Sequence, residues 1–166
     1  MTRACSRAVA LIAAVAGASV SGCPSAYQET YDQTTQRLEA QQRANEQQQA
    51  ALHAQAQKYA AVVYFAVDSA ALDDDAQRQL RWFVQQMRPY PQATFNVQGF
   101  TDSTGSEANN QVLADQRANN VAAYLNAQGI DMSRMAVNGF GATDAAATNA
   151  TAEGRRNNRR VEVTVR

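Results

Sequence analysis

Short apolar and alternating segments predict four β-strands in the second part of the chain. Val, Tyr and Phe dominate 61–65, as in a strand with a buried face. Apolar and polar positions alternate along 94–99 and again along 161–166, which gives each segment one face for a core and one for solvent. A short apolar run at 135–139 completes the set. These segments predict one sheet of four strands.

Two longer segments carry apolar residues at helical spacing. They are 72–87 and 107–128, and Gly129 ends the second. Three consecutive aspartates at 73–75 precede the first helix; we favour capping over a metal site, because no other ligands are in view. The small-residue segment 143–158 predicts a loop, with one helical turn at most. The order β-α-β-α-β-β predicts an α+β sandwich, with one mixed sheet packed on two main helices.

A Gln- and Ala-rich segment at 23–60 precedes this domain, which we expect to span 61–166. Good helix formers fill the segment, so it predicts a helix or a partly flexible linker. One heptad column contains Tyr31, Leu38, Asn45, Leu52 and Tyr59. The complementary column is polar, so half of a coiled-coil seam is absent. We therefore favour a solvated spacer over a dimerising coiled coil.

The first 22 residues have the features of a signal peptide. Arg3 and Arg7 form a basic start, and the apolar run at 8–20 is short for a membrane span. The run ends in Val-Ser-Gly followed by Cys23, which resembles a bacterial lipobox. The alternative is an ordinary signal peptide with an incidental cysteine. We favour lipidation of Cys23, and Pro24 after it favours the outer membrane, facing the periplasm, over inner-membrane retention.

Charge and the scarcity of Cys and His exclude several classes of function. The chain has 15 basic and 15 acidic residues; removal of Arg3 and Arg7 with the signal peptide leaves 13 and 15, a net charge of −2. Nucleic acid is therefore not an expected partner. Cys5 leaves with the signal, and His53, the sole histidine, lies in the linker. The domain thus lacks a disulfide, a Cys or His metal site and a histidine base, and we expect no metal, no cofactor and no catalytic residue.

One carboxylate and one guanidinium stand out within 96–117. Asp102 follows a predicted strand in a loop with a glycine on each side, and Arg117 lies fifteen residues later on the apolar face of a helix. A charge on an apolar face is costly unless it is paired. Arg117 could extend its head group to solvent, form an internal salt bridge with Asp102, or meet a ligand carboxylate at the edge of the core. With an ammonium on Asp102, the pair would suit a ligand with an amino-acid head group.

The carboxyl-terminal segment is rich in arginine, at Arg155, Arg156, Arg159 and Arg160. Such a cluster can mark a nucleic-acid patch. Because the mature chain is acidic overall, contacts with acidic parts of a cell wall, or with Glu153 and Glu162, are the favoured interpretation.

Three ordered motifs resemble the OmpA-like peptidoglycan-binding domain, which occurs in OmpA, in Pal lipoproteins and in flagellar stators. They are TDS-x-GS from residue 101, N-x-x-L-x-x-x-RA-x-x-V from 110 and N-x-T-x-EGR-x-x-NRRVE from 149. The resemblance covers 61–166 and implies binding of meso-diaminopimelate in the peptide stems of peptidoglycan. It implies that Asp102 and Arg117 are the key ligand residues. It also implies supporting roles for Thr104, Asn110 and Arg160.

The resemblance leads to three hypotheses. The first is a non-catalytic lipoprotein that tethers the outer membrane to peptidoglycan, with outer-membrane lipid bound through Cys23. The second is a periplasmic interaction protein of a Tol-type or secretion complex, with envelope proteins as partners and wall binding as an accessory role. The third, a wall hydrolase, is disfavoured, because Asp102 has no matched acid or base. A stator is disfavoured too, because no transmembrane helix is expected after processing.

Overall fold

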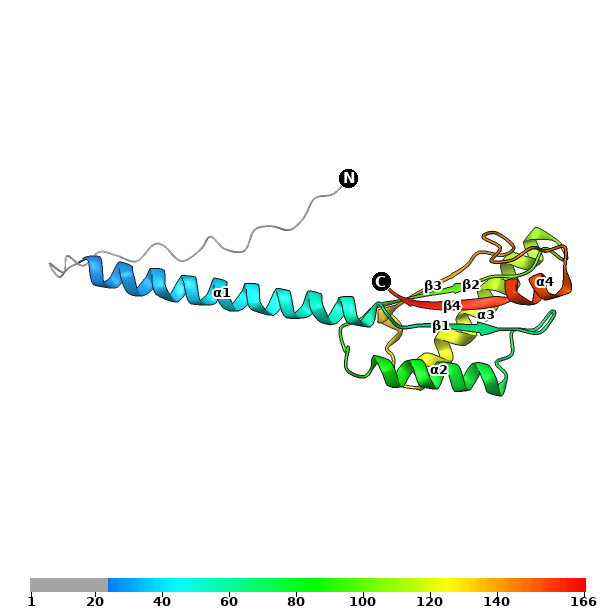
Figure 1. The fold of residues 1–166 in the computed structure, drawn as a ribbon, viewed down its shortest axis with the longest axis horizontal. Coiled ribbons are helices and arrows are strands. Elements are labelled where there is room, and N and C mark those ends of the chain that lie inside the picture. The colour runs from blue at the N-terminus through cyan, green and yellow to red at the C-terminus, as the bar shows by residue number, and fades with distance from the viewer. Residues whose placement is uncertain (1–23) are drawn as a thin grey trace. The chain divides into compact units, whose positions relative to one another are not determined.

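The computed structural model describes residues 24–166 (Figure 1). The signal peptide expected at 1–22 and the lipid acceptor expected at Cys23 lie outside these residues. The chain divides between Ala44 and Asn45 into two compact units. The described part of the first unit is helical, and the second unit contains the whole sheet.

The Gln- and Ala-rich segment forms helix α1 (Pro24–Ala56). It is a continuous helix of 33 residues, as the favourable helix propensities of Gln and Ala predict. Two residues of the heptad column, Tyr31 and Leu38, are 61% and 56% exposed. Ala56, at the end of the helix, is fully buried in the core of the second unit. The preference for a solvated spacer over a dimerising coiled coil stays an untested prediction.

Four strands form one mixed sheet, as predicted. They are β1 (Ala60–Tyr64), β2 (Phe95–Gly99), β3 (Met135–Gly139) and β4 (Arg160–Val165), and their order across the sheet is β1-β4-β2-β3. Strand β4 is antiparallel to both neighbours, whereas β2 and β3 are parallel. The loops that follow β1, β2 and β3 and the residues that precede β4 therefore gather at the same end of the sheet.

Two main helices pack on the sheet, which confirms the predicted α+β class (Figure 1). Helix α2 (Asp74–Met87) lies along β1, and α3 (Glu107–Ala127) lies along β2 and β3. The core between the layers contains fully buried side chains from β1, β2, β4, α2 and α3, including Val63, Leu80, Phe83, Phe95, Val97, Val121, Leu125, Val161 and Val163. Asp73 caps α2 by accepting a hydrogen bond from the backbone N–H of Ala76, which confirms the capping interpretation of the aspartates.

The segment 143–158 is more ordered than predicted. It ends in helix α4 (Ala152–Asn158), seven residues long, where we expected a loop with one helical turn at most. Thr151 caps this helix by accepting a hydrogen bond from the N–H of Gly154. A side chain at Gly154 would collide with the carbonyl of Thr148, so only glycine lets the helix pack this closely on its own preceding loop. The short 3-10 helix η1 (Met132–Arg134) was also not predicted.

Candidate functional site

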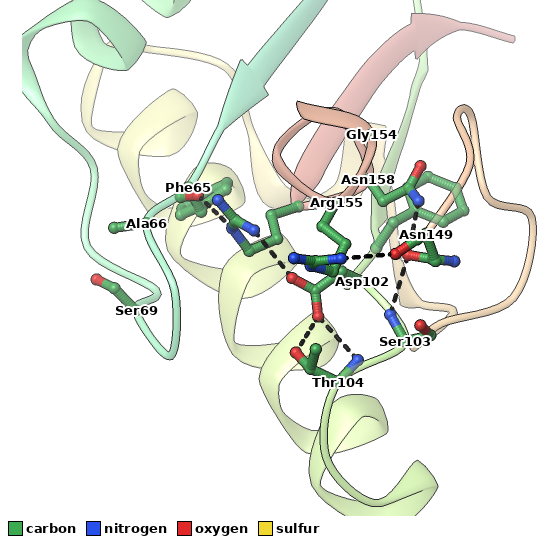
Figure 2. A network of polar contacts seen from close by, with 12 residues as sticks. Phe65, Ala66, Ser69, Asp102, Ser103, Thr104, Asn149, Gly154, Arg155 and Asn158 are labelled. Carbon is green, nitrogen blue, oxygen red and sulfur yellow. Dashed lines mark hydrogen bonds and ion pairs between the residues drawn. The ribbon is translucent and has the colours of Figure 1, made fainter. Parts of the chain in front are cut away.

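Asp102 lies in the loop between β2 and α3. The loop leaves the sheet at Gly99, where a side chain would collide with the carbonyl of Ala114 on α3. Asp102 is 5% exposed. Its Oδ1 accepts a hydrogen bond from the backbone N–H of Thr104 at 3.0 Å and another from the Thr104 hydroxyl (Figure 2). Gly105, with φ of +89°, then turns the chain into α3. The loop thus holds a buried carboxylate in one orientation.

Arg159 neutralises this carboxylate. Its Nη1 donates to Oδ2 of Asp102 at 2.9 Å, and its Nε donates to the carbonyl of Phe65 at 3.1 Å. Burial alone would raise the pKa of Asp102, but hydrogen bonds from Thr104 and Arg159 outweigh burial and hold the pKa below its usual value. Asp102 is therefore ionised at neutral pH and accepts three hydrogen bonds, two on Oδ1 and one on Oδ2.

Arg117 is buried more completely than any of the alternatives anticipated. It is 0% exposed, so the interpretation in which its head group reaches solvent is wrong. Its guanidinium donates from Nε to the carbonyl of Ser69 (2.8 Å), from Nη1 to that of Phe100 (3.1 Å) and from Nη2 to that of Ala66 (2.9 Å). It also lies over the ring of Phe65, 5.1 Å from the centroid.

The internal salt bridge considered for Arg117 is made by Arg159 instead. Among residues 24–166, Asp102 pairs with Arg159 and with no other cation. The pKa of Arg117 is lowered to about 10, mainly by burial and also by the charge of Arg159, while the charges of Asp102 and Asp68 act in the opposite direction. Two guanidinium groups therefore lie close to one buried carboxylate.

Two polar side chains near this loop lack partners. Asn110, in the first turn of α3, is 7% exposed, and its side-chain amide has no hydrogen-bond partner within residues 24–166. The hydroxyl of Thr101 is buried and likewise unpaired in the described part of the chain. Buried polar groups are usually hydrogen-bonded, so these two groups are available to a ligand or to water.

A network of amides joins the Asp102 loop to α4 (Figure 2). Asn158 is fully buried; it exchanges hydrogen bonds of 2.9 and 2.8 Å with the backbone of Ala147 and donates to Oδ1 of Asn149 at 2.9 Å. The same oxygen of Asn149 accepts a hydrogen bond from the N–H of Ser103 at 3.2 Å, and Arg155 donates to the carbonyl of Asn149 at 2.8 Å. This network fixes one wall of the site.

Arg160 lies away from the Asp102 cluster. In β4 the side chains of Val161 and Val163 face the helices, so those of Arg160 and Glu162 face the opposite side of the sheet. Arg160 pairs with Glu162 at 2.6 Å, which confirms the expected contact with that residue, and it lies over the ring of Phe100, 4.0 Å from the centroid.

The structure thus brings most of the expected residues to one loop. Asp102 and Thr104 are bonded directly, and Asn110 and Arg117 flank the same loop, whereas Arg160 does not join them. Arg159 is the residue that sequence reasoning missed. The alternation of side chains along the last strand could have identified Arg159, because a buried Val161 places Arg159 on the same side of the sheet and Arg160 on the other.

No group of three or more His, Cys, Asp or Glu side chains within residues 24–166 could hold a metal ion. No helix in that range is long and apolar enough to cross a membrane.

The model of the OmpA family matches residues 64–159. The probable lipoprotein YiaD of Escherichia coli K-12 is 42% identical over 103 residues, which are 62% of this chain and 47% of that protein. The peptidoglycan-binding protein ArfA of Mycobacterium tuberculosis H37Rv is 40% identical over 103 residues, which are 62% of this chain and 32% of that protein. The chain therefore spans half or less of the length of these two relatives.

Solved structures show the same fold. The peptidoglycan-associated lipoprotein of Burkholderia pseudomallei superimposes with a TM-score of 0.61 at 27% identity, covering 64% of this chain and 90% of that one. The cell wall anchor of the type VI secretion system of Pseudomonas aeruginosa superimposes with a TM-score of 0.56 at 33% identity, covering 64% of this chain and 79% of that one.

Proposed function

This chain belongs to the OmpA family, and on that premise we propose that its folded domain binds peptidoglycan, without cleaving it, through the diaminopimelate of the peptide stem. The observation that carries the proposal is the buried, ionised Asp102 beside the guanidinium of Arg159 and the unpaired amide of Asn110. A ligand that bears both an ammonium and a carboxylate complements this arrangement. The names of the ArfA and Burkholderia proteins refer to peptidoglycan and support binding of that polymer.

The proposed binding site contains Asp102, Thr104, Asn110 and Arg117, as the family resemblance implies. Arg160, the fifth residue it implies, would contact the wall only from the opposite side of the sheet, because its side chain points away from Asp102. A test is calorimetric titration of the protein with a soluble tripeptide muropeptide that contains meso-diaminopimelate. Saturable binding by the wild type is expected; no heat at millimolar ligand would contradict the proposal.

The proposed cellular role is a tether between the outer membrane and the cell wall. Lipidation of Cys23 would fix one end in the outer membrane, and helix α1, with 33 residues, would extend roughly 50 Å toward the wall. Many copies held in one plane act together, so modest affinity per copy is sufficient. The lipoprotein names of two matched proteins support this role. Mass spectrometry of the protein from membranes should find acyl chains on Cys23, and an unmodified thiol there would contradict the tether.

The same site supports a non-catalytic role. Asp102 is held by Thr104 and Arg159, so it has neither a free proton nor a paired acid or base. None of the relatives compared above is named as an enzyme. Release of muropeptides from sacculi by the pure protein would contradict this part of the proposal.

A second candidate is an interaction protein of a Tol-type or secretion complex, with wall binding as an accessory role. The similarity to the type VI secretion anchor supports it. Pull-downs with and without soluble diaminopimelate peptides would distinguish the tether from the interaction protein. Capture of an envelope protein that the peptides do not alter would favour this second role.

A further inference from the structure

The two edges of the sheet differ in how well they are covered. Strand β3 forms one edge, where two side chains of α3 bind the outward backbone groups of Gly139: Asp115 accepts from its N–H at 2.9 Å, and Gln111 donates to its carbonyl at 2.8 Å. Strand β1 forms the other edge. Its five residues, AAVVY, include no charged side chain and no proline, which are the usual protections of an exposed edge strand. The β1 edge is therefore open to a further strand.

The hydrogen-bond pattern of the ladder identifies the backbone groups that β1 presents at this edge. The N–H of Phe65 donates to the carbonyl of Arg159 at 2.9 Å. Because bonded positions alternate along an antiparallel pair, Phe65 and every second residue before it bond to β4. The N–H and carbonyl groups of Val62 and Tyr64 therefore point away from β4. No group within the described range 24–166 forms a hydrogen bond with them, so they are the groups with which an added strand would pair.

A groove of about 350 Å³ lies beside this edge, between β1 and α2. Its lining consists of small or apolar residues of the strand and longer side chains of the helix: Ala60, Ala61, Val62, Arg78, Gln79 and Trp82. Trp82, the sole tryptophan, is 50% exposed. Arg78 is the charged residue of the lining, and its ion-pair partner Asp75 has a side chain that is 72% exposed. Such an exposed pair contributes little and is readily exchanged, so the groove offers an aromatic surface and a positive charge.

The spacing of Trp82 and Arg78 matches that of side chains along a strand. The two residues are four positions apart on α2, so they share one side of the helix and lie about 6 Å apart along its axis. Side chains two positions apart on a strand share one face and lie about 6.6 Å apart. Because α2 lies along β1 (Figure 1), a strand added to β1 would turn every second side chain towards α2. An apolar residue that contacts Trp82 would then place an acidic residue, two positions away, beside Arg78.

We propose that the β1 edge and this groove dock an extended segment of another protein, which adds to the sheet as a fifth strand and carries an apolar and an acidic residue two positions apart. The inference goes beyond the proposed wall binding. The Asp102 loop follows the last residue of β2, at the end of the sheet where β1 also ends, whereas the groove lies beside the first residues of β1. One molecule can therefore hold the wall and the segment together.

A second copy of this chain is a less suitable occupant. Two β1 strands that pair about a two-fold axis through Val62 run antiparallel, so the segments that lead into them from α1 lie at opposite ends. In a tether, both copies need the same end towards the membrane. The axis would also bring the Arg78 side chains of the two copies together, because Arg78 and Val62 line the same groove. Like charges there would oppose the pairing.

The test is a titration of the nitrogen-15-labelled protein with three capped nonapeptides of threonine and serine, followed by NMR. The first has a central leucine and a glutamate two positions before and after it, which satisfies the spacing in either strand direction. The second has the same composition with both glutamates next to the leucine, and therefore on the opposite face. The third is the first with lysine in place of glutamate. We expect saturable shifts of the Val62 and Tyr64 amides and the Trp82 indole with the first peptide, and about 2- to 5-fold weaker binding of the other two.

Three variants assign the contacts. Val62→Pro removes an outward N–H and leaves the ladder with β4 intact, and an edge strand tolerates proline at such a position; it should weaken the first peptide at least about 5-fold. Trp82→Ala should weaken it to a similar degree, and Arg78→Glu should reverse the preference between the first and third peptides. All three variants should still pellet with sacculi, because none of these residues belongs to the Asp102 site.

The absence of saturable shifts at millimolar peptide, or equal binding of the first two peptides, would overturn the inference. Undiminished binding by Trp82→Ala together with an unchanged preference in Arg78→Glu would also overturn it, and these two variants carry the test if Val62→Pro does not fold. Shifts of the Val62 and Tyr64 amides that grow with protein concentration alone would assign the edge to a second copy instead. Sacculus binding by the wild type is measured separately, so failure of this inference and failure of the proposed function are distinguishable.

Discussion

Replacement of Arg117 by methionine tests whether the buried guanidinium of Arg117 stabilises the fold. Methionine keeps an unbranched chain of similar length and removes three hydrogen bonds to backbone carbonyls. Hydrogen bonds to charged groups contribute about 1.5–3 kcal/mol each, so the gross loss is roughly 4–9 kcal/mol. Against this, burial lowers the pKa of Arg117 to about 10, which corresponds to a cost of about 3 kcal/mol for keeping the charge in place. The hydrogen bonds outweigh that cost.

We therefore expect Arg117→Met to lower the free energy of unfolding by about 3 kcal/mol, or the melting temperature by about 10–15 °C. Most of the loss comes from the carbonyl of Phe100, because Phe100 is buried, whereas exposed Ala66 can regain water. Arg117→Lys should be at least as harmful. A lysine ammonium pays the same burial cost and cannot span three carbonyls.

Urea denaturation followed by circular dichroism measures both variants. Arg156→Met is the matched control, because Arg156 is an exposed arginine on α4, and it should change stability by less than about 0.5 kcal/mol. The reasoning is refuted if Arg117→Lys is as stable as the wild type, or if Arg117→Met is neutral. Either result would mean that the hydrogen bonds of the Arg117 guanidinium do no more than offset the free-energy cost of burying its charge.

Three further predictions concern stability. Because the folded pKa of Asp102 lies below its unfolded value of 3.8, its ionised form stabilises the protein above that pH, and the stability advantage over Asp102→Asn should shrink as the pH falls from 5 to about 2 in urea titrations. Asn158→Ala should lower the free energy of unfolding by about 2–3 kcal/mol, because it leaves the backbone N–H and carbonyl of Ala147 without their hydrogen bonds. Limited proteolysis of this variant should then cut within 143–151. Gly139→Ala should lower the free energy of unfolding, measured by thermal melting, by at least about 2 kcal/mol, because the new Cβ would lie 2.5 Å from the backbone nitrogen of Asp115.

The sequence predicted those parts of the fold that rest on periodic burial. The strand Met135–Gly139 and the start of α3 at Glu107 match the predicted segments, because their apolar residues face one core and their ends carry a glycine or a cap. Helix α4 was not predicted, because it contains no large apolar residue and the contact that defines it, Gly154 against Thr148, involves no side chain.

The sequence predicted two residues of the candidate site, Asp102 and Arg117, but not the hydrogen-bond partners of either. Asp102 and Arg117 follow from a carboxylate in a glycine-flanked loop and a charge on an apolar helix face. The partner of Asp102 lies 57 residues away along the chain, at the junction of α4 and β4, so only the assembled sheet brings Arg159 to it. Three backbone carbonyls satisfy Arg117, and no pattern of side chains encodes that arrangement.

The central claim, that the Asp102 site binds peptidoglycan, is tested most directly by co-sedimentation with purified sacculi. Asp102→Ala removes the proposed contact, and Asp75→Ala, at an exposed aspartate of α2, is the matched control. The account predicts that the wild type and Asp75→Ala pellet with sacculi, while folded Asp102→Ala stays in the supernatant. Undiminished sedimentation of Asp102→Ala would contradict the account.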